Sequence, residues 1–148
     1  MNVRNNDSKC NHAIFKYHVF WRLEVIDKNI KLLVVDDNTQ IRELIRLSFK
    51  RQPKVEVFEA INGSEGFKLF QELHPDIVLS DVMMPGEIDG LSLCKQIKES
   101  VNKCPVVLIS GKGQQSDIDL GLAAGADVYK VKPFGPIDLI NLVNELVH

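Results

Sequence analysis

The sequence contains little cysteine, no long uninterrupted apolar run and no excess of charge of one sign. Its three cysteines, Cys10, Cys94 and Cys104, are odd in number and lack metal-ligand spacing, so we expect reduced thiols in a cytoplasmic protein. No segment reaches the roughly 18 consecutive apolar residues of a membrane helix. A formal net charge of −2, from 18 basic and 20 acidic residues, gives no reason to expect a nucleic-acid partner.

The segment that comes nearest to an apolar run covers residues 13–26. Charged or imidazole side chains interrupt it at Lys16, His18, Arg22 and Glu24. Because no small-residue cleavage site follows, we expect neither a signal peptide nor a membrane anchor. Residues 1–12 are polar and aperiodic, and we expect them to lack fixed structure. Together with the apolar segment they form an N-terminal extension, residues 1–28, which we expect to be partly disordered or to dock on the domain.

Strand-like and helix-like segments alternate through residues 29–148, which we predict to be one domain. The expected strands are 30–36, 55–60, 77–81, 106–110 and 128–131. The expected helices are 39–50, a segment between Asn62 and Pro75, 91–99, 117–124 and 136–147. Such alternation is typical of a parallel sheet covered on both faces. The predicted fold class is therefore α/β, a doubly wound parallel sheet of five strands, and 45% apolar residues suffice for its core.

Charged or hydroxyl side chains stand where four of these strands end. They are Asp36 and Asp37, Asp81, Ser110 and Lys132. The carboxyl ends of parallel strands lie along one edge, where open α/β sheets bind ligands, so we expect these side chains to converge. Three carboxylates repel one another until a divalent cation joins them, and a lysine and a hydroxyl beside a cation suit a phosphoryl group. The sequence therefore predicts a site for Mg2+ and a phosphate.

Within this predicted site, Asp81 is the expected nucleophile because its strand would be central in the sheet. A carboxylate can attack phosphorus when a metal neutralises charge and a cation attracts the phosphoryl oxygens. Lys132 would contact the transferred group, and Ser110 would donate a hydrogen bond to it. Met83 can offer its backbone carbonyl as a further oxygen ligand to Mg2+, beside the carboxylates.

Several of these residues also have an ordinary structural explanation. Asp36 and Asp37, taken alone, can form a solvated turn before a helix. Lys132 can be a surface lysine, although a cis bond to Pro133 would direct its ammonium inward. Tyr129 is, from the residues alone, best explained as a half-buried strand aromatic with its hydroxyl in water.

Five short motifs in order together resemble the receiver domain of response regulators. They are Val34-Val35-Asp36-Asp37-Asn38, Asp81-Val82-Met83-Met84-Pro85-Gly86, Asp89-Gly90-Leu91, Leu108-Ile109-Ser110-Gly111 and Tyr129-Lys130-Val131-Lys132-Pro133-Phe134. Each motif is weak alone, but five at the family's separations are specific, and the resemblance covers about residues 29–148. It implies a flavodoxin-like fold with strand order 2-1-3-4-5.

The resemblance also implies a chemistry for the acidic residues. Asp81 would accept a phosphoryl group from a histidine kinase or a histidine phosphotransfer protein. Mg2+ would bind Asp37, Asp81 and the Met83 carbonyl, with Asp36 helping directly or through water. The chain would then be a signalling switch with slow self-dephosphorylation rather than an enzyme.

A conformational switch is the next implication of the resemblance. Ser110 would move toward the phosphoryl group, and Tyr129 would turn inward into the space vacated. This would reshape the surface formed by the fourth helix, fifth strand and fifth helix, where a downstream protein would bind. A homodimer formed on phosphorylation is a further expectation.

Two departures from the family pattern stand near the site. Residues 86–88 make the loop before Asp89 one residue longer than the commonest family spelling. Gly111 and Lys112 stand where a small alanine often follows the hydroxyl residue. We expect Lys112 to alter how fast water reaches the phosphoryl group.

Two alternative functions fit the sequence less well than the switch. A Mg2+-dependent phosphatase of the haloacid dehalogenase type needs a second aspartate two residues after the nucleophile, where this chain has Met83. A scaffold that binds partners without phosphorylation would not need such self-repelling charges. Whether the switch acts alone or is separated from an output domain stays open.

Overall fold

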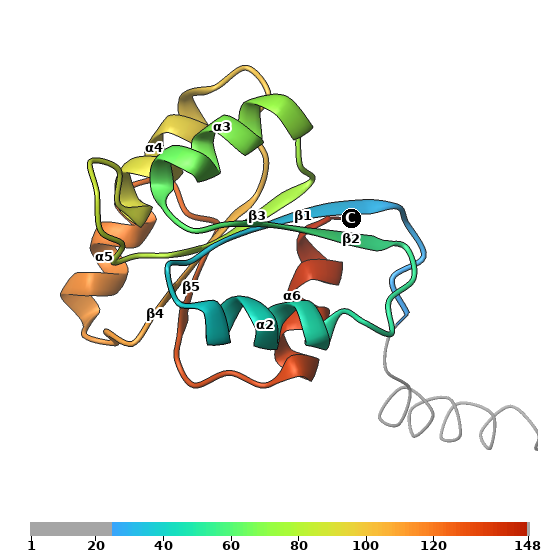
Figure 1. Ribbon diagram of the computed structural model, residues 1–148. Coiled ribbons are helices and arrows are strands. Elements are labelled where there is room, and N and C mark those ends of the chain that lie inside the picture. Colours follow the sequence, from blue (N-terminus) through green and yellow to red (C-terminus); the bar gives the residue numbers. More distant parts are fainter. Residues whose placement is uncertain (1–24, 148) are drawn as a thin grey trace, which may run out of the picture.

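The computed structural model describes residues 25–147, and residues 1–24 and 148 lie outside the described part. The N-terminal extension expected over residues 1–28 therefore falls almost wholly outside it, as does Cys10. The described elements alternate along the chain (Figure 1). They are β1 Ile30–Val35, α2 Thr39–Ser48, β2 Val55–Ala60, α3 Gly63–Leu73, β3 Ile77–Asp81, α4 Gly90–Glu99, β4 Val106–Ser110, α5 Gln115–Ala123, β5 Val128–Val131 and α6 Pro136–Leu146.

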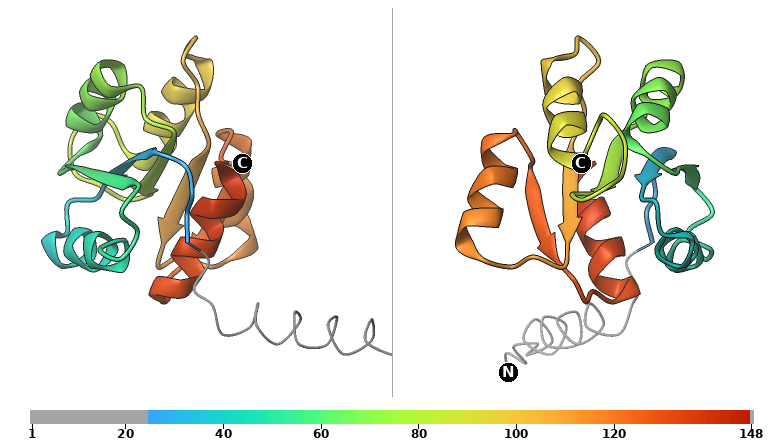
Figure 2. Two further views of the ribbon diagram at one scale, coloured as in Figure 1. Left: turned by 90° about the vertical axis from the view of Figure 1, so that its right-hand side faces the viewer. Right: turned by 60° about the vertical axis from the view of Figure 1, so that its left-hand side comes forward.

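The five strands form one parallel sheet in the order β2-β1-β3-β4-β5. Helices α2 and α6 cover one face, and α3, α4 and α5 cover the other (Figures 1 and 2). The register aligns the carboxyl ends: Val35 lies opposite Ser80, and Asp81 lies opposite Ile109. The predicted doubly wound fold and its strand order are confirmed, and β3 is the central strand.

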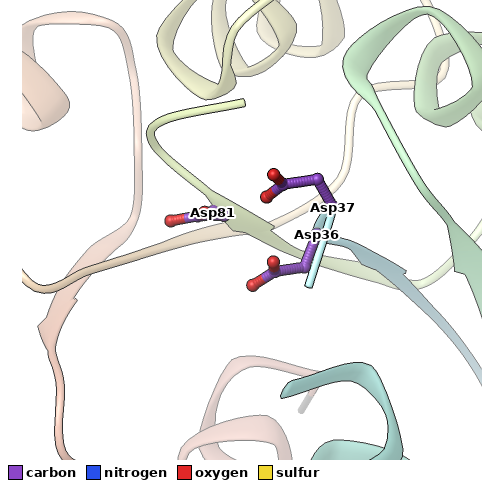
Figure 3. Close-up of side chains that lie close together, drawn as sticks. All are labelled: Asp36, Asp37 and Asp81. Carbon is purple, nitrogen blue, oxygen red and sulfur yellow. The ribbon is translucent and has the colours of Figure 1, made fainter. Parts of the chain in front are cut away.

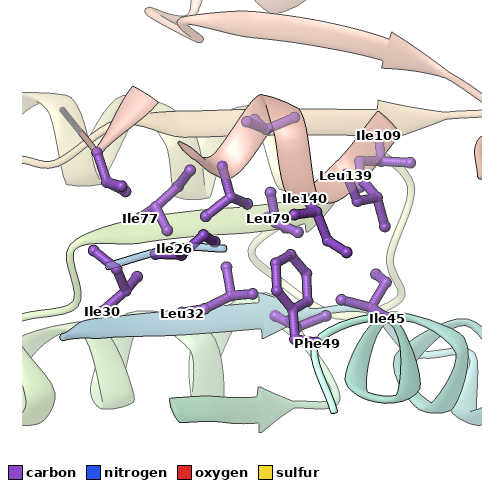
Figure 4. Packing of buried hydrophobic residues seen from close by; sticks show 14 residues of the cluster. Ile26, Ile30, Leu32, Ile45, Phe49, Ile77, Leu79, Ile109, Leu139 and Ile140 are labelled. Carbon is purple, nitrogen blue, oxygen red and sulfur yellow. The ribbon is translucent and has the colours of Figure 1, made fainter. Parts of the chain in front are cut away.

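Alternate residues of the central strands fill two separate apolar cores. Leu32 and Val34 of β1 face α2 and α6, whereas Leu33 and Val35 face α3 and α4. A strand buried on both faces reads as a continuous apolar run, because successive side chains point to opposite faces. Figure 4 shows the first core, in which isoleucine and leucine side chains of the strands pack against Phe49 and the α6 residues.

Helix ends differ from the sequence prediction by one or two residues, and side-chain caps mark the starts of α2, α3 and α4. Asn38 caps α2 as predicted, because its Oδ1 accepts hydrogen bonds from the N–H groups of Gln40 and Ile41. The side chain of Asp89 accepts from the N–H of Ser92, so α4 begins at Gly90. The first strand ends one residue early, although the Asp36 N–H still donates to the Ala60 carbonyl.

The described chain enters the fold at Ile26, whose side chain is fully buried in the core shown in Figure 4. Its N–H donates a hydrogen bond of 2.9 Å to Oε1 of Gln52. Cys94 and Cys104 are buried free thiols, which agrees with the reduced thiols expected from the sequence. Between residues 25 and 147, none of the helices has the length and apolar character needed to span a bilayer.

Candidate functional site

Three carboxylates meet where β1 and β3 end, side by side in the sheet. One oxygen from each of Asp36, Asp37 and Asp81 lies within 4.8 Å of the other two (Figure 3). Asp36 is 3% exposed, whereas Asp37 is open to solvent and Asp81 is between the two. The parallel register explains the meeting, because Val35 and Ser80 pair directly before two of these residues.

The ammonium of Lys132 completes this cluster from the far side of β4. Its Nζ lies 3.8 Å from Oδ2 of Asp36 and 3.7 Å from Oδ1 of Asp81. The backbone N–H of Lys132 donates to the Ser110 carbonyl, and the bond to Pro133 is cis. Lys132 therefore faces the acidic cluster, and the surface-lysine interpretation does not describe its position.

Burial dominates the electrostatics of two of the carboxyl groups. It raises the pKa of Asp36 and of Asp81 above the ordinary range. For Asp81, the Lys132 ammonium and backbone N–H groups oppose the rise in pKa without cancelling it. The carboxylates thus carry an unfavourable charge density that another cation would relieve.

The donor set fits a magnesium ion. Mg2+ prefers hard oxygen ligands, and it is commonly held by one or two carboxylates together with water and phosphate oxygens. Asp36, Asp37 and Asp81 supply such oxygens at one point, and Lys132 is the one ammonium paired with them among the described residues. Negative charge is therefore left over for a divalent cation to balance.

The other predicted site residues lie around this cluster. Ser110 is buried, and its Oγ accepts a hydrogen bond of 3.1 Å from the N–H of Lys112. Met83 follows Asp81 in the loop before α4, and the residue is 58% exposed. The Tyr129 hydroxyl donates a hydrogen bond of 2.8 Å to the Lys112 carbonyl, which corrects the interpretation that leaves this hydroxyl in water.

The loop between β3 and α4 folds closely over Asp81. The Gly90 N–H donates to the Val82 carbonyl at 2.9 Å. A Cβ atom at Gly90 would lie 1.9 Å from the Asp81 carbonyl oxygen, so only glycine fits here. Residues 86–88 of this lengthened loop begin with Gly86, whose φ of 104° suits glycine. The loop borders a hollow of about 510 Å3 that Lys112 and Tyr129 also line.

Sequence reasoning missed Arg42 as a residue of this site. Its Nη1 donates a hydrogen bond of 2.7 Å to the Asp36 carbonyl, and its Nε lies 3.3 Å from Oε1 of Glu59. Arg42 thereby holds the turn that carries Asp36 and Asp37 against β2. The available signal was an arginine in the first turn of a helix that begins directly after the acidic pair, together with a glutamate near the end of the next strand.

The comparisons with known proteins agree with this geometry. The sequence model of the response regulator receiver domain matches residues 32–144. The chain is 38% identical over 117 residues to the transcriptional regulatory protein ResD of Bacillus subtilis, with 79% of this chain and 48% of ResD covered. It is 39% identical over 102 residues to the transcriptional regulatory protein AfsQ1 of Streptomyces coelicolor, with 69% and 44% covered.

A solved structure of the same kind also superposes on the fold. The receiver domain of the Francisella response regulator 1452 matches with a TM-score of 0.74 and 33% identity, covering 80% of this chain and 97% of that one. The chain spans slightly less than half the length of the two curated relatives. Sequence, fold and the arrangement of the acidic cluster lead to one conclusion: this chain belongs to the response regulator receiver domain family.

Proposed function

We propose that this chain is a phosphoryl-accepting switch in which Asp81 takes the group from a histidine kinase or a histidine phosphotransfer protein. One observation carries the proposal: the Lys132 ammonium lies 3.7 Å from an oxygen of Asp81 in the acidic cluster at the end of the central strand. A carboxylate held beside a fixed cation is placed to attack a phosphorus atom whose oxygens that cation attracts. The family is one of signalling switches, which agrees with this role.

The transfer exchanges one bond to phosphorus for another. An Asp81 oxygen forms the new P–O bond, and the P–N bond to the donor imidazole breaks. The imidazole nitrogen keeps the electron pair of that bond and takes a proton from solvent water. Lys132 attracts the phosphoryl oxygens, and Ser110 donates its hydroxyl to one of them. Mg2+, held by Asp36, Asp37, Asp81 and the Met83 carbonyl, would neutralise charge between the carboxylates and the phosphoryl group.

Two hydrogen bonds of Lys112 link Ser110, beside the phosphoryl site, to Tyr129, which lies on the surface where a downstream protein would bind. Its N–H donates to Ser110, and its carbonyl accepts from the Tyr129 hydroxyl. If Ser110 moves toward a phosphoryl group, the hydrogen bond from the Lys112 N–H to its Oγ breaks. Lys112 then becomes freer to move, and the hydrogen bond that its carbonyl accepts from Tyr129 weakens. Tyr129 then turns inward, and the surface of α5, β5 and α6 changes for a downstream protein. A homodimer formed on phosphorylation would pair through the same changed surface of α5, β5 and α6.

The output of the switch is a separate part of the proposal. ResD and AfsQ1 are transcriptional regulators about twice as long as the matched part. We propose that this chain acts on an output protein, either as a stand-alone switch or as the receiver of a longer regulator, without binding nucleic acid itself. The phospho-aspartate is lost by slow self-hydrolysis, and Lys112 affects the rate at which water reaches it.

The test is Mg2+-dependent modification by a small phosphoryl donor. The wild type and Asp81→Asn are incubated with acetyl phosphate and either Mg2+ or EDTA, and intact mass is measured. Asp119→Asn, which changes an exposed carboxylate on α5, is the matched control. We expect one phosphoryl adduct with Mg2+ in the wild type and in Asp119→Asn, and none in Asp81→Asn. An equal adduct in Asp81→Asn would overturn the proposal, and no adduct in any protein would favour the scaffold.

A further inference from the structure

An apolar groove lies between the last turn of α2 and the first turns of α6, the two helices that share one face of the sheet (Figure 2). Its volume is about 340 Å3, and its lining includes Leu44, Leu47, Ile137 and Ile140. Leu44, Leu47 and Ile137 are 41%, 53% and 59% exposed. Adjoining apolar side chains in contact with water indicate a surface that another apolar group covers.

The described chain begins at the margin of this groove. Gln52 lines the groove, and its side-chain Oε1 accepts the hydrogen bond from the Ile26 N–H. Ile26 itself is fixed in the core, whereas Val25 before it is 64% exposed. Whatever precedes Val25 is therefore tethered within a few residues of the groove.

The residues attached to this tether are unusually rich in apolar and aromatic side chains. Within residues 13–24 these are Ala13, Ile14, Phe15, Tyr17, Val19, Phe20, Trp21 and Leu23. The segment carries four of the ten aromatic residues of the chain, although it holds only twelve of its 148 residues. Twelve residues reach at most about 40 Å when extended, which is ample for a groove that begins beside the tether.

We propose that residues 13–24 dock on their own chain and bury Trp21 and its aromatic neighbours in the groove between α2 and α6. A short tether gives the segment an effective concentration on the order of millimolar. A second copy or a separate partner reaches such a concentration only in concentrated solution, so the segment of the same chain occupies the groove first. The lining of the groove contains no residue of the acidic cluster, so we expect this docking without phosphorylation.

The test uses Trp21, the single tryptophan of the chain. Its emission and its quenching by acrylamide are measured in the full chain, in Leu47→Glu and in Ile137→Glu. Leu120→Glu is the matched control, since Leu120 is a 59% exposed leucine on α5, over the opposite face of the sheet. All three substitutions are on the surface, where the fold tolerates change, and circular dichroism verifies folding.

We expect blue-shifted, weakly quenched emission in the wild type and in Leu120→Glu. In Leu47→Glu and Ile137→Glu the emission shifts to the red, and the quenching constant rises severalfold. Identical emission in all four proteins would overturn the proposal. A blue shift that disappears on dilution, together with a dimer in sedimentation velocity, would overturn the proposal and show that a second copy of the chain occupies the groove. A blue shift seen only with vesicles of anionic phospholipid would overturn the proposal and show that the segment binds a membrane surface.

Discussion

At the scale of single residues, the acidic cluster sets a dependence of stability on pH. Burial raises the pKa of Asp36 and Asp81, with Lys132 opposing the rise. A carboxyl group whose pKa is higher in the folded than in the unfolded chain binds more protons when folded. The free energy of unfolding therefore falls as pH rises from the unfolded pKa through the folded pKa. Metal-free protein loses this part of its stability above the ordinary carboxyl range, and a bound divalent cation restores it.

Removing one of these charges should stabilise the metal-free protein. In Asp81→Asn we expect the melting temperature in EDTA at neutral pH to rise by about 4 °C, which corresponds to roughly 1 kcal/mol for a domain of this size. The reason is that the amide keeps the shape of the side chain without its buried charge. Calorimetry with and without Mg2+ measures how the substitution and the cation change the melting temperature. Mg2+ should raise the melting temperature of the wild type more than that of the variant. A lower melting temperature of the variant in EDTA would show that the charge stabilises the fold.

Two buried thiols should resist alkylation in the native protein. Burial raises the pKa of Cys94 to about 11 and that of Cys104 to about 12, so almost no thiolate is present at neutral pH. We expect iodoacetamide to leave both residues unmodified in buffer and to modify both in denaturant, as measured by peptide mapping. Native alkylation at the rate of a small free thiol would contradict their buried positions.

At the scale of elements, Gly121 of α5 determines where the Tyr129 ring lies. A Cβ atom at position 121 would come within 2.4 Å of a Tyr129 ring carbon. The ring packs there against the helix while its hydroxyl donates to the Lys112 carbonyl. The helix and β5 thus hold the aromatic ring at the surface that we propose changes on phosphorylation.

Gly121→Ala should displace this ring. We expect changed ring resonances of Tyr129 in NMR spectra and a loss of about 1–3 kcal/mol in the free energy of unfolding, the usual cost of overpacking. Tyr17→Phe in the background leaves Tyr129 as the single tyrosine. Gly111→Ala is the control, since a Cβ there meets no atom within 4 Å. Unchanged Tyr129 resonances in Gly121→Ala would contradict the packing.

Elements and their order were predictable because their signals are local. The apolar runs of β1, β3 and β4 are interrupted only by Lys31 near the start of β1 and by the polar residues that end β3 and β4. The N-cap side chain of Asn38 marks the start of α2. The converging positions of Asp36 and Asp81 followed from the parallel sheet. The hydrogen bond between Tyr129 and Lys112 spans 17 positions, and nothing local in the sequence reports which carbonyl a tyrosine hydroxyl reaches.

Arg42 escaped prediction for a different reason. An arginine on the first turns of a helix is ordinarily a solvated residue, and its carboxylate partner, Glu59, stands on another strand. Only the packing of β2 beside β1 brings that carboxylate to the helix start, where the guanidinium also contacts the Asp36 carbonyl. The roles of Asp81, Lys132 and their neighbours in phosphoryl transfer stay predictions.

At the scale of the whole molecule, helix α2 connects two surfaces of different chemistry. It begins at its cap Asn38, directly after the acidic pair, and its last turn forms one wall of the apolar groove. The sheet order places the site at the carboxyl ends of the four neighbouring strands β1, β3, β4 and β5, where ligands bind in open α/β sheets. We therefore propose phosphoryl transfer at that edge of the sheet and intramolecular docking at the groove.

The most direct test of the central claim is the position of the phosphoryl group. The protein is modified by acetyl phosphate with Mg2+ and reduced with borohydride, which converts a phosphorylated aspartate into homoserine, and the peptides are then sequenced by mass spectrometry. We predict homoserine at position 81 and unmodified aspartate at positions 36, 37 and 119. Homoserine at any of these other positions, with Asp81 intact, would contradict it.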